Sequence, residues 1–316
     1  MLVVTAEEIR RLAPMPALIE ALREAFRNGC VAPVRHAASV PGGAGDRLVL
    51  TMPAFQPDGR GVVKLVTVFP DNRARQLPTV GALIVVLSET GQPTAVLDGS
   101  AITQLRTAAA SALASTYLSR ADSTHLVIMG TGALAPYMAL AHCAVRPIRS
   151  IAVWGRREAR STATVAAVRA LVGADVRVLA PNSLKEALAT AHIVSCATTS
   201  PTPVLAGEWL QPGVFVDLVG SFTPTTREAD DAVVCRSRIF VDTLAGAMAE
   251  AGDILDPLAR GVIKRTQIEG ELADLVSGRA TGRRTPAEII LFKSVGAAIE
   301  DLAASQLVMR ALRAPP

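Results

Sequence analysis

The sequence predicts an α/β protein in which a doubly wound parallel sheet is joined to a smaller α+β domain. From about residue 120 onward, short apolar segments of strand length alternate with helical segments, which is typical of a parallel sheet. Residues 1–118 follow another pattern, in which several strands succeed one another between two helices. The chain has 316 residues, which is enough for two domains with separate cores.

The first region is predicted to begin with a helix over residues 6–28. Thr5 and Glu8 have the spacing of a capping box, which closes the first turn of a helix. The segment Glu89–Pro93 carries turn residues between two apolar runs and therefore predicts a hairpin. The predicted strands lie at 47–52, 61–69, 80–87 and 94–98, and an alanine-rich helix follows at 101–118.

The second region carries the alternating pattern. Its predicted strands lie at 125–129, 150–154, 175–179, 192–197, 214–219, 238–241 and 288–294. The last helix, 297–311, has apolar residues at helical spacing along one face, so we expect it to pack back onto the first domain. The predicted domains are residues 119–296, and residues 1–118 together with 297–316.

A glycine-rich turn follows the strand at 125–129 directly. The segment Gly130-Thr-Gly-Ala-Leu-Ala135 separates that strand from a helix. Strand, glycine turn and helix in this order form the dinucleotide-binding fingerprint of the Rossmann fold, whereas a glycine turn alone would be weak support. Gly130 permits the tight turn, and Gly132 lets backbone amides approach a pyrophosphate at the helix N-terminus. Ala135 provides the small side chain that close packing of helix and strand requires.

The end of the next strand, 150–154, indicates which dinucleotide binds. An NAD site usually carries an aspartate or glutamate there, which holds the ribose hydroxyls. This chain has Gly155-Arg156-Arg157 instead, and two arginines suit the additional phosphate of NADP. The alternative is that Arg156 and Arg157 are only a solvated strand end. The sequence therefore favours NADPH as the cofactor, with NADH as the alternative.

Composition and charge argue against several classes of protein. The chain has 32 basic and 28 acidic residues without a basic block, so we expect no nucleic-acid partner. Half of the residues are apolar, yet no apolar run approaches the roughly 20 residues of a membrane span. The N-terminus lacks the pattern of a signal peptide, and the four cysteines and four histidines have no metal-type spacing. We expect a cytoplasmic protein with no metal site and no membrane partner.

Two cations lie in otherwise apolar surroundings. Lys64 falls inside an apolar strand, and Arg106 falls inside the alanine-rich helix. A buried charge is costly unless it is paired or meets water in a cleft. The alternatives are an exposed strand face for Lys64 and a helix surface for Arg106. If these two converged with Arg35, the three cations would bind a substrate carboxylate, for which arginine supplies a bidentate fork.

A series of short motifs occurs along nearly the whole chain. They are Val34-Arg35, Met52–Ala54, Lys64–Thr67, Leu97–Gly99, Thr103–Ala109, Gly130–Gly132, Val219–Pro224 with Glu228 and Asp230, Glu250–Asp253, and Phe292–Gly296 with Asp301. With these motifs the chain resembles the ornithine cyclodeaminase/mu-crystallin family. Several of them are specific to that family, and their order and spacing make chance similarity improbable.

The resemblance implies a homodimer in which the N-terminal region and the C-terminal helix form the substrate-binding and dimerisation domain. It implies that Arg35, Lys64 and Arg106 grip the substrate carboxylate, with Lys64 and Arg106 as the catalytic pair. Met52 and Thr79 would also line the substrate site. The cofactor residues that the resemblance implies are Thr107, Gly130, Thr131, Gly132, Ala133, Leu134, Arg156, Arg157 and Ser294, the last near the nicotinamide.

The chain departs from the cyclodeaminases of this family at one position. They carry an aspartate after the fifth strand of the dinucleotide domain, where it supports loss of ammonia from ornithine; here that position corresponds to Phe222. A phenyl ring neither accepts a proton nor activates water. The alternative is that the loop shifts by one residue and Glu228 substitutes. Leu134, where much of the family has glutamine, is a second departure to which we attach little functional weight.

Hydride transfer to a carbon–nitrogen double bond beside a carboxylate does not require that aspartate. Phe222 would then lie beside the substrate ring, as in the branch of the family that resembles ketimine reductases. We therefore expect reduction of a cyclic imino acid, 1-pyrroline-2-carboxylate or 1-piperideine-2-carboxylate, to L-proline or L-pipecolate, with catalysis mostly by positioning. The alternatives are an alanine- or opine-type dehydrogenase, a residual ornithine cyclodeaminase, and a non-catalytic protein of mu-crystallin type that binds NADPH and a small ligand.

Overall fold

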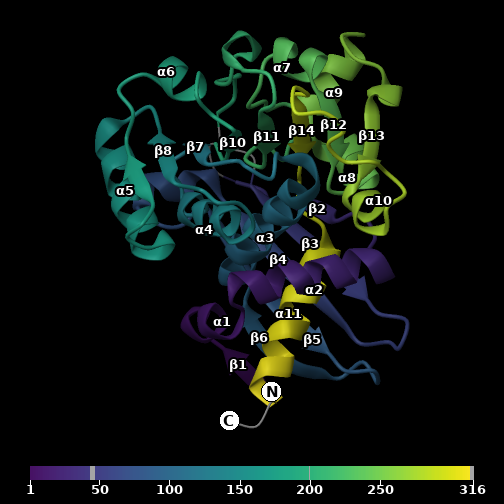
Figure 1. The fold of residues 1–316 in the computed structure, drawn as a ribbon. Coiled ribbons are helices and arrows are strands. Elements are labelled where there is room, and N and C mark those ends of the chain that lie inside the picture. The colour runs from purple at the N-terminus through teal and green to yellow at the C-terminus, as the bar shows by residue number, and fades with distance from the viewer. Residues whose placement is uncertain (43–46, 199, 314–316) are drawn as a thin grey trace. The chain divides into compact units, whose positions relative to one another are not determined.

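The structure is a computed structural model that describes residues 1–42, 47–198 and 200–313 (Figure 1). Two compact units can be distinguished, one of residues 1–107 with the C-terminal segment from Ala297, the other of residues 108–296. The boundary therefore falls inside helix α3 (Gly99–Leu118) rather than at residue 118. The second half of α3 packs with the second unit, where Ser111 donates a 2.9 Å hydrogen bond to the buried Asp217. Composition does not reveal such a boundary because the helix is continuous.

The first unit is built on a six-stranded sheet. Strands β6, β5, β4, β3 and β2 are antiparallel, and β1 pairs in parallel with β6. Helices α1, α2 and α11 pack together on this sheet. In order across the sheet the strands are β1 (Leu2–Val4), β6 (Pro93–Asp98), β5 (Val80–Leu87), β4 (Gly61–Val68), β3 (Leu48–Phe55) and β2 (His36–Ser39); the helices are α1 (Ala6–Leu12), α2 (Met15–Asn28), η1 (Pro70–Arg75) and α11 (Ala298–Arg313).

The predicted helix over 6–28 is in fact two helices. Helix α1 ends at Leu12, and Pro14 takes an extended conformation as the N-cap of α2. A proline lacks an N–H and clashes with a preceding helical turn, which explains the break. The predicted capping box is confirmed, because Thr5 Oγ1 accepts the N–H of Glu8 and the Glu8 carboxylate accepts the N–H of Thr5.

The two faces of the six-stranded sheet differ in what covers them. Leu50, Met52, Val66, Ile84 and Leu97 belong to the buried face. The opposite face is also apolar but remains partly exposed. Leu65 and Leu83, which pair across β4 and β5, are 37% and 39% exposed. An apolar face of this kind on an antiparallel sheet is unusual, because the solvated face normally carries polar residues.

The second unit contains an eight-stranded, fully parallel sheet, which confirms the predicted doubly wound α/β fold. The strands β10, β11 and β14 are buried at every position, so both faces of the sheet are covered. In order across the sheet the strands are β13 (Ile268–Glu271), β12 (Arg238–Val241), β14 (Ile290–Lys293), β11 (Phe215–Leu218), β10 (Ile193–Cys196), β7 (His125–Met129), β8 (Ser150–Trp154) and β9 (Arg177–Leu179). The chain winds outward from β7 through β8 and β9, then returns to the other side of β7 with β10.

The helices of this unit lie between the strands along the chain. They are α4 (Ala135–Val145), α5 (Glu158–Val172), α6 (Leu184–Leu188), η2 (Gly207–Trp209), α7 (Asp231–Arg236), α8 (Leu244–Glu250), α9 (Gly252–Ala259), η3 (Arg265–Gln267) and α10 (Leu272–Ser277). In open parallel sheets, ligands bind outside the carboxyl ends of the strands where the winding direction reverses. That point lies between β7 and β10 here, so the turns that follow these two strands are the expected cofactor position.

Candidate active site

Two cations meet on one carboxylate in the first unit. Lys64 lies in β4 and Arg106 in α3, and these residues are only 1% and 4% exposed. Nζ of Lys64 and Nε of Arg106 lie 2.8 and 3.1 Å from Oδ1 of Asp301, which α11 contributes. The exposed positions that the sequence left as alternatives are therefore wrong for both cations. The strand, the internal helix and the C-terminal helix each supply one member of this cluster.

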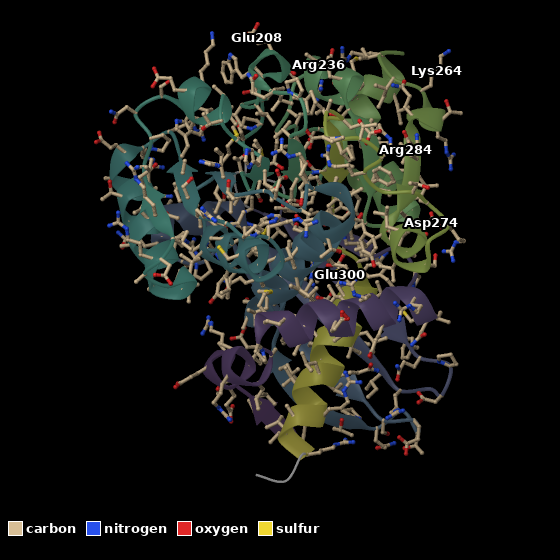
Figure 2. All side chains as sticks on the ribbon, in the orientation of Figure 1. Glu208, Arg236, Lys264, Asp274, Arg284 and Glu300 are labelled. Carbon is tan, nitrogen blue, oxygen red and sulfur yellow. The ribbon has the colours of Figure 1, made fainter. Side chains whose placement is uncertain are left out.

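Glu300 completes the group, and we call Lys64, Arg106, Glu300 and Asp301 the cation cluster. Nη1 of Arg106 donates a 2.7 Å hydrogen bond to Glu300, which lies in the first turn of α11 and is labelled in Figure 2. Lys64 also donates to Oγ1 of Thr103 at 3.3 Å. The two positive and two negative charges balance, which is the condition under which buried ions are tolerated. Among the described residues, the hydrogen bonds of the Arg106 guanidinium come from Nε and Nη1, so Nη2 is the nitrogen that remains available to a ligand.

Burial and neighbouring charges set the protonation of both cations. Burial lowers the pKa of Lys64, and the positive charge of Arg106 lowers it further, to about 8, although Asp301 and Glu300 oppose the change. Burial also disfavours the charged form of Arg106, but Asp301 and Glu300 outweigh it and raise the pKa of the guanidinium. Near neutral pH both groups are therefore positively charged, and Lys64 is the one that titrates close to that range.

The other predicted substrate residues of the first unit are not all brought to the cluster. Met52 is buried in β3 directly opposite Lys64. Arg35 is half-buried and immediately precedes β2. The first residue of β2, His36, pairs with Thr51, which is adjacent to Met52 in β3. Thr79 immediately precedes β5, whereas the residue of β5 that pairs with Lys64 is Ile84. The strand from Val80 to Ile84 spans roughly 14 Å at about 3.4 Å per residue, so Thr79 lies at the end of β5 that is remote from Lys64. Thr107 is buried next to Arg106 in α3.

The glycine turn of the second unit has the geometry that the sequence predicts. Gly130 has a φ of 130°, and a side chain there would collide with the carbonyl oxygen of Ala197 after β10. Gly132 is exposed, and a Cβ added to it would meet no atom within 4 Å. Ala135 is fully buried at the first position of α4, as close packing requires. Thr131, Ala133 and Leu134 complete the turn, which therefore has open space in front of a helix N-terminus.

The end of β8 lies against this turn. A Cβ on Gly155 would lie 2.5 Å from Cγ2 of Thr131, so a larger residue there would have to displace the Thr131 side chain. Arg156 and Arg157 follow, and both are exposed. No carboxylate occupies the position at which NAD sites usually carry one. The residues around the turn thus fit a nicotinamide dinucleotide, and two exposed arginines lie at the end of the neighbouring strand.

Phe222 lies in the loop after β11, half-buried against the hydrophobic core of the second unit. Glu228, the alternative acid, is fully buried. Its oxygens accept the backbone N–H groups of Thr198 and Gly220, each at 2.7 Å, and that of Ser221 at 3.3 Å. Both oxygens of this buried side chain are therefore engaged by the backbone, which disfavours the alternative in which Glu228 replaces the missing aspartate.

Ser294 follows β14 and is buried. Its hydroxyl donates to Oδ2 of Asp242 at 3.3 Å, and the same oxygen accepts the N–H groups of Val295 and Gly296 at 2.8 and 2.7 Å. Asp242 therefore fixes the turn that carries Ser294. Because the hydroxyl is engaged in this way, the backbone of the turn is the better candidate for contact with a cofactor.

The structure assigns holding roles to charged residues for which the sequence predicted no such role. Predicted site residues are held by Glu300, Asp301 and Asp242. A separate buried group consists of Glu228, Asp253 and Lys293, each of which is fully buried. The signal available in the sequence was a charge inside an apolar context, as for Lys64. Glu300 and Asp301 fall within the apolar face of the last helix, and Lys293 falls within a predicted strand.

Residues 1–42, 47–198 and 200–313 contain no group of three histidine, cysteine or acidic side chains arranged to hold a metal ion. Within the same residues, no helix combines the length and the apolar character needed to cross a bilayer.

The chain is similar to known proteins along its full length. It is 35% identical over 316 residues to the Δ1-pyrroline-2-carboxylate reductase of Colwellia psychrerythraea, an alignment that covers 99% of each protein. The structure of the Thermococcus litoralis enzyme of the same name, in complex with NADH and L-proline, superposes with a TM-score of 0.93 at 33% identity, covering 98% of this chain and 97% of that one. An archaeal alanine dehydrogenase dimer with bound NAD superposes with a TM-score of 0.89 at 29% identity, covering 98% and 95%.

The model of one protein family matches residues 1–314, nearly the entire chain. This match agrees with the resemblance that the motifs carry, and it includes both units and the C-terminal helix. The protein therefore belongs to the ornithine cyclodeaminase/mu-crystallin family.

Proposed function

We propose that this protein is an oxidoreductase that reduces the C=N bond of a cyclic ketimine carboxylate, with 1-pyrroline-2-carboxylate giving L-proline. The observation that carries this proposal is the likeness, along the whole chain, to a reductase solved with NADH and L-proline. The nicotinamide supplies a hydride to the imine carbon, and the nitrogen gains a proton, so that the C=N bond becomes CH–NH. The six-membered 1-piperideine-2-carboxylate, which would give L-pipecolate, is the second ring size to be tested.

The cation cluster supports binding of the substrate carboxylate. Lys64 and Arg106 are already held by two acids, and Nη2 of Arg106 remains as a charged donor for a substrate carboxylate. The cluster is neutral overall, and an α-imino acid with a protonated nitrogen is also neutral overall. Binding such a substrate therefore adds no net charge to a buried site. Arg35 and Met52 are assigned to the same site because they lie at or beside the neighbouring strand positions.

The second unit supplies the cofactor residues. A nicotinamide dinucleotide fits the glycine turn at Gly130–Gly132, and the turn after β14 with Ser294 is assigned to the nicotinamide end. We assign NADPH as the preferred form on the basis of Arg156 and Arg157, with NADH as the alternative, since relatives are solved with NADH and with NAD.

Phe222 supports a reductase over a cyclodeaminase. Loss of ammonia requires a group that accepts and returns protons, and Phe222 offers only an apolar ring. Glu228 is engaged by three backbone N–H groups, and the other carboxylate of the loop after β11, Asp230, accepts the N–H groups of Gly207 and Val233 as the N-cap of α7. The ring of Phe222 is assigned to contact with the ring of the imine.

Assembly as a homodimer is proposed through the uncovered face of the six-stranded sheet. Leu65 and Leu83 lie opposite each other at its centre, flanked by Val63 and Val85, which also pair with each other. Exposed apolar patches of this kind mark interfaces in soluble proteins. A second copy of the same face is the simplest partner, because a two-fold axis makes one patch complementary to itself.

The test is a steady-state assay of the purified protein. NADPH and NADH oxidation is followed at 340 nm with the five- and six-membered cyclic imines, and ammonia release from L-ornithine is measured with NAD⁺ supplied. We expect rapid reduction of at least one imine and no ammonia release above background. Robust ammonia release would identify a cyclodeaminase, and binding of NADPH without turnover of either imine would identify a binding protein of mu-crystallin type.

A further inference from the structure

Glu228 joins two loops of the second unit that are distant in sequence. Its Oε1 accepts the N–H of Thr198, which follows β10, and its Oε2 accepts the N–H groups of Gly220 and Ser221, which follow β11. The two loops are in close contact, because a Cβ on Gly220 would collide with the backbone of Thr198. Both loops lie at carboxyl ends of the parallel strands, the edge at which dinucleotides bind.

Asp253 and Lys293 hold Glu228 in place. Oδ1 of Asp253 accepts the backbone N–H groups of Glu228 and Ala229 at 2.8 and 3.1 Å. Nζ of Lys293 lies 3.1 Å from Oδ2 of Asp253 and 4.0 Å from Oε2 of Glu228. Lys293 ends β14 and immediately precedes Ser294. The buried trio therefore connects the loops after β10, β11 and β14.

We propose that ionised Glu228 is a positioning residue for hydride transfer, which fixes the loops after β10 and β11 and with them Phe222. The proposal rests on the proposed function, since Phe222 is assigned there to contact with the imine. The chemistry of the side chain explains why the charge matters. An ionised carboxylate only accepts hydrogen bonds, so both of its oxygens can face N–H donors. A protonated carboxyl group or an amide carries a donor on one side, and that side cannot accept a backbone N–H. The loop that faces the donor therefore loses its hydrogen bond.

The surroundings of Glu228 place its ionisation near neutral pH. Burial raises its pKa to about 7; Lys293 and the N–H groups of Thr198 and Gly220 oppose the increase, whereas Asp253 adds to it. The charged and titratable groups facing it are Lys293 at the end of β14, Asp253 in α9 and the buried thiol of Cys196 in β10. Above about pH 7 the two loops are held by an ionised carboxylate, and below it one of the contacts weakens.

The first experiment compares the wild type with Glu228→Gln over pH 5.5–9, using the cyclic imine and the preferred cofactor. For the wild type we expect kcat to increase about tenfold between pH 6 and pH 8, as a single ionisation near pH 7 requires. The variant should lack this dependence and remain about tenfold or more below the wild-type maximum. Its dissociation constant for the cofactor should change less than about threefold, since the glycine turn is intact.

Glu288→Gln is the matched control. Glu288 also accepts two backbone N–H groups, from Arg284 at 2.8 Å and Thr285 at 3.2 Å, but it precedes β14 at the opposite edge of the sheet. The control should retain both the maximal kcat and its pH dependence. If Glu228→Gln behaved like the control, the positioning role would be refuted.

A second measurement needs no variant and covers the case in which Glu228→Gln does not fold. Deuterium uptake of the wild-type protein with bound cofactor is compared at pH 6 and pH 8, after correction for intrinsic exchange rates. Peptides that follow β10 and β11 should exchange faster at pH 6, whereas the strand peptides of β7 should not change. Equal protection at both pH values would overturn the proposal. If the loops respond to pH but the wild type reduces no imine, the loop contacts stand and the proposed function fails.

Discussion

Lys64 and Arg106 share a single acceptor, because Nζ of one and Nε of the other lie 2.8 and 3.1 Å from the same carboxylate oxygen of Asp301. Two cations that would repel each other are thereby held side by side in a buried environment. Glu300 takes a second nitrogen of the guanidinium and fixes its plane. A substrate carboxylate would be a third acceptor for a pair whose orientation is already set, so little conformational freedom is lost on binding.

Replacement of Arg106 is expected to affect both activity and folding. Arg106→Ala should lower kcat/KM for the imine by roughly 30-fold or more, since removing one partner of a partly buried charged contact costs about 2–5 kcal/mol. It also leaves Glu300 without its cation and Asp301 with Lys64 alone, which should lower the free energy of unfolding by about 3–5 kcal/mol. Thermal melting and cofactor titration separate the two effects.

Arg106→Lys is the matched variant for this position. It keeps the charge but not the planar fork, so it should restore most of the stability and only part of kcat/KM. Cofactor affinity should remain near that of the wild type in both variants. Near-normal kcat/KM in a folded Arg106→Ala protein would mean that the carboxylate binds elsewhere.

Substrate affinity is expected to fall at alkaline pH because of Lys64. Its pKa is lowered to about 8 by burial and by Arg106, so the positive charge is present below that pH and is lost as the pH rises through it. The measurement is the inhibition constant of a planar ring carboxylate, pyrrole-2-carboxylate, whose own charge is constant between pH 6 and 10. The constant should increase between pH 7 and 9.5.

Lys64→Arg provides the comparison, because a guanidinium stays charged throughout this range. With this variant the inhibition constant should be independent of pH, whatever its absolute value. A persistent increase with pH in Lys64→Arg would assign the dependence to another group.

The proposed preference for NADPH is expected to depend on Arg156 and Arg157. Replacing both with alanine should raise KM for NADPH about tenfold, because charge-assisted hydrogen bonds to the additional phosphate are lost. KM for NADH should be nearly unchanged. Equal increases for both cofactors would indicate a disturbed fold, and no increase for either would show that these arginines are only a solvated strand end.

The dimer is expected to depend on the uncovered face of the six-stranded sheet. Leu65→Asp combined with Leu83→Asp places two charges at its centre, where they would be buried without partners in a dimer. Light scattering coupled to size exclusion should then report a monomer where the wild type gives a dimer. Leu171→Asp, which changes an equally exposed leucine of the second unit, is the control and should remain dimeric. If the double variant stays dimeric, the interface lies elsewhere.

Local sequence patterns determined the architecture. The alternation of strands and helices after residue 120 predicted the parallel sheet, and the glycine spacing at Gly130 predicted the turn between β7 and α4, because both depend on interactions within a few residues. Elements with weak local signals were missed or misjudged. The edge strands β1 and β2 and the terminal strand β13 are short, and the break at Pro14 was overlooked within a longer apolar pattern.

The sequence also identified Lys64 and Arg106 as unusual, because a charge in an apolar segment is visible without a structure. It did not determine whether either cation was buried, since the same pattern fits an exposed face. Only the tertiary structure placed both on Asp301, a residue about 200 positions away along the chain in a separate helix. The same holds for Glu228, Asp253 and Lys293, which three different segments bring together. The hydrophobic periodicity of a sequence indicates which face of a helix or strand a residue occupies. The partner that compensates a buried charge depends instead on how elements distant in the sequence pack together.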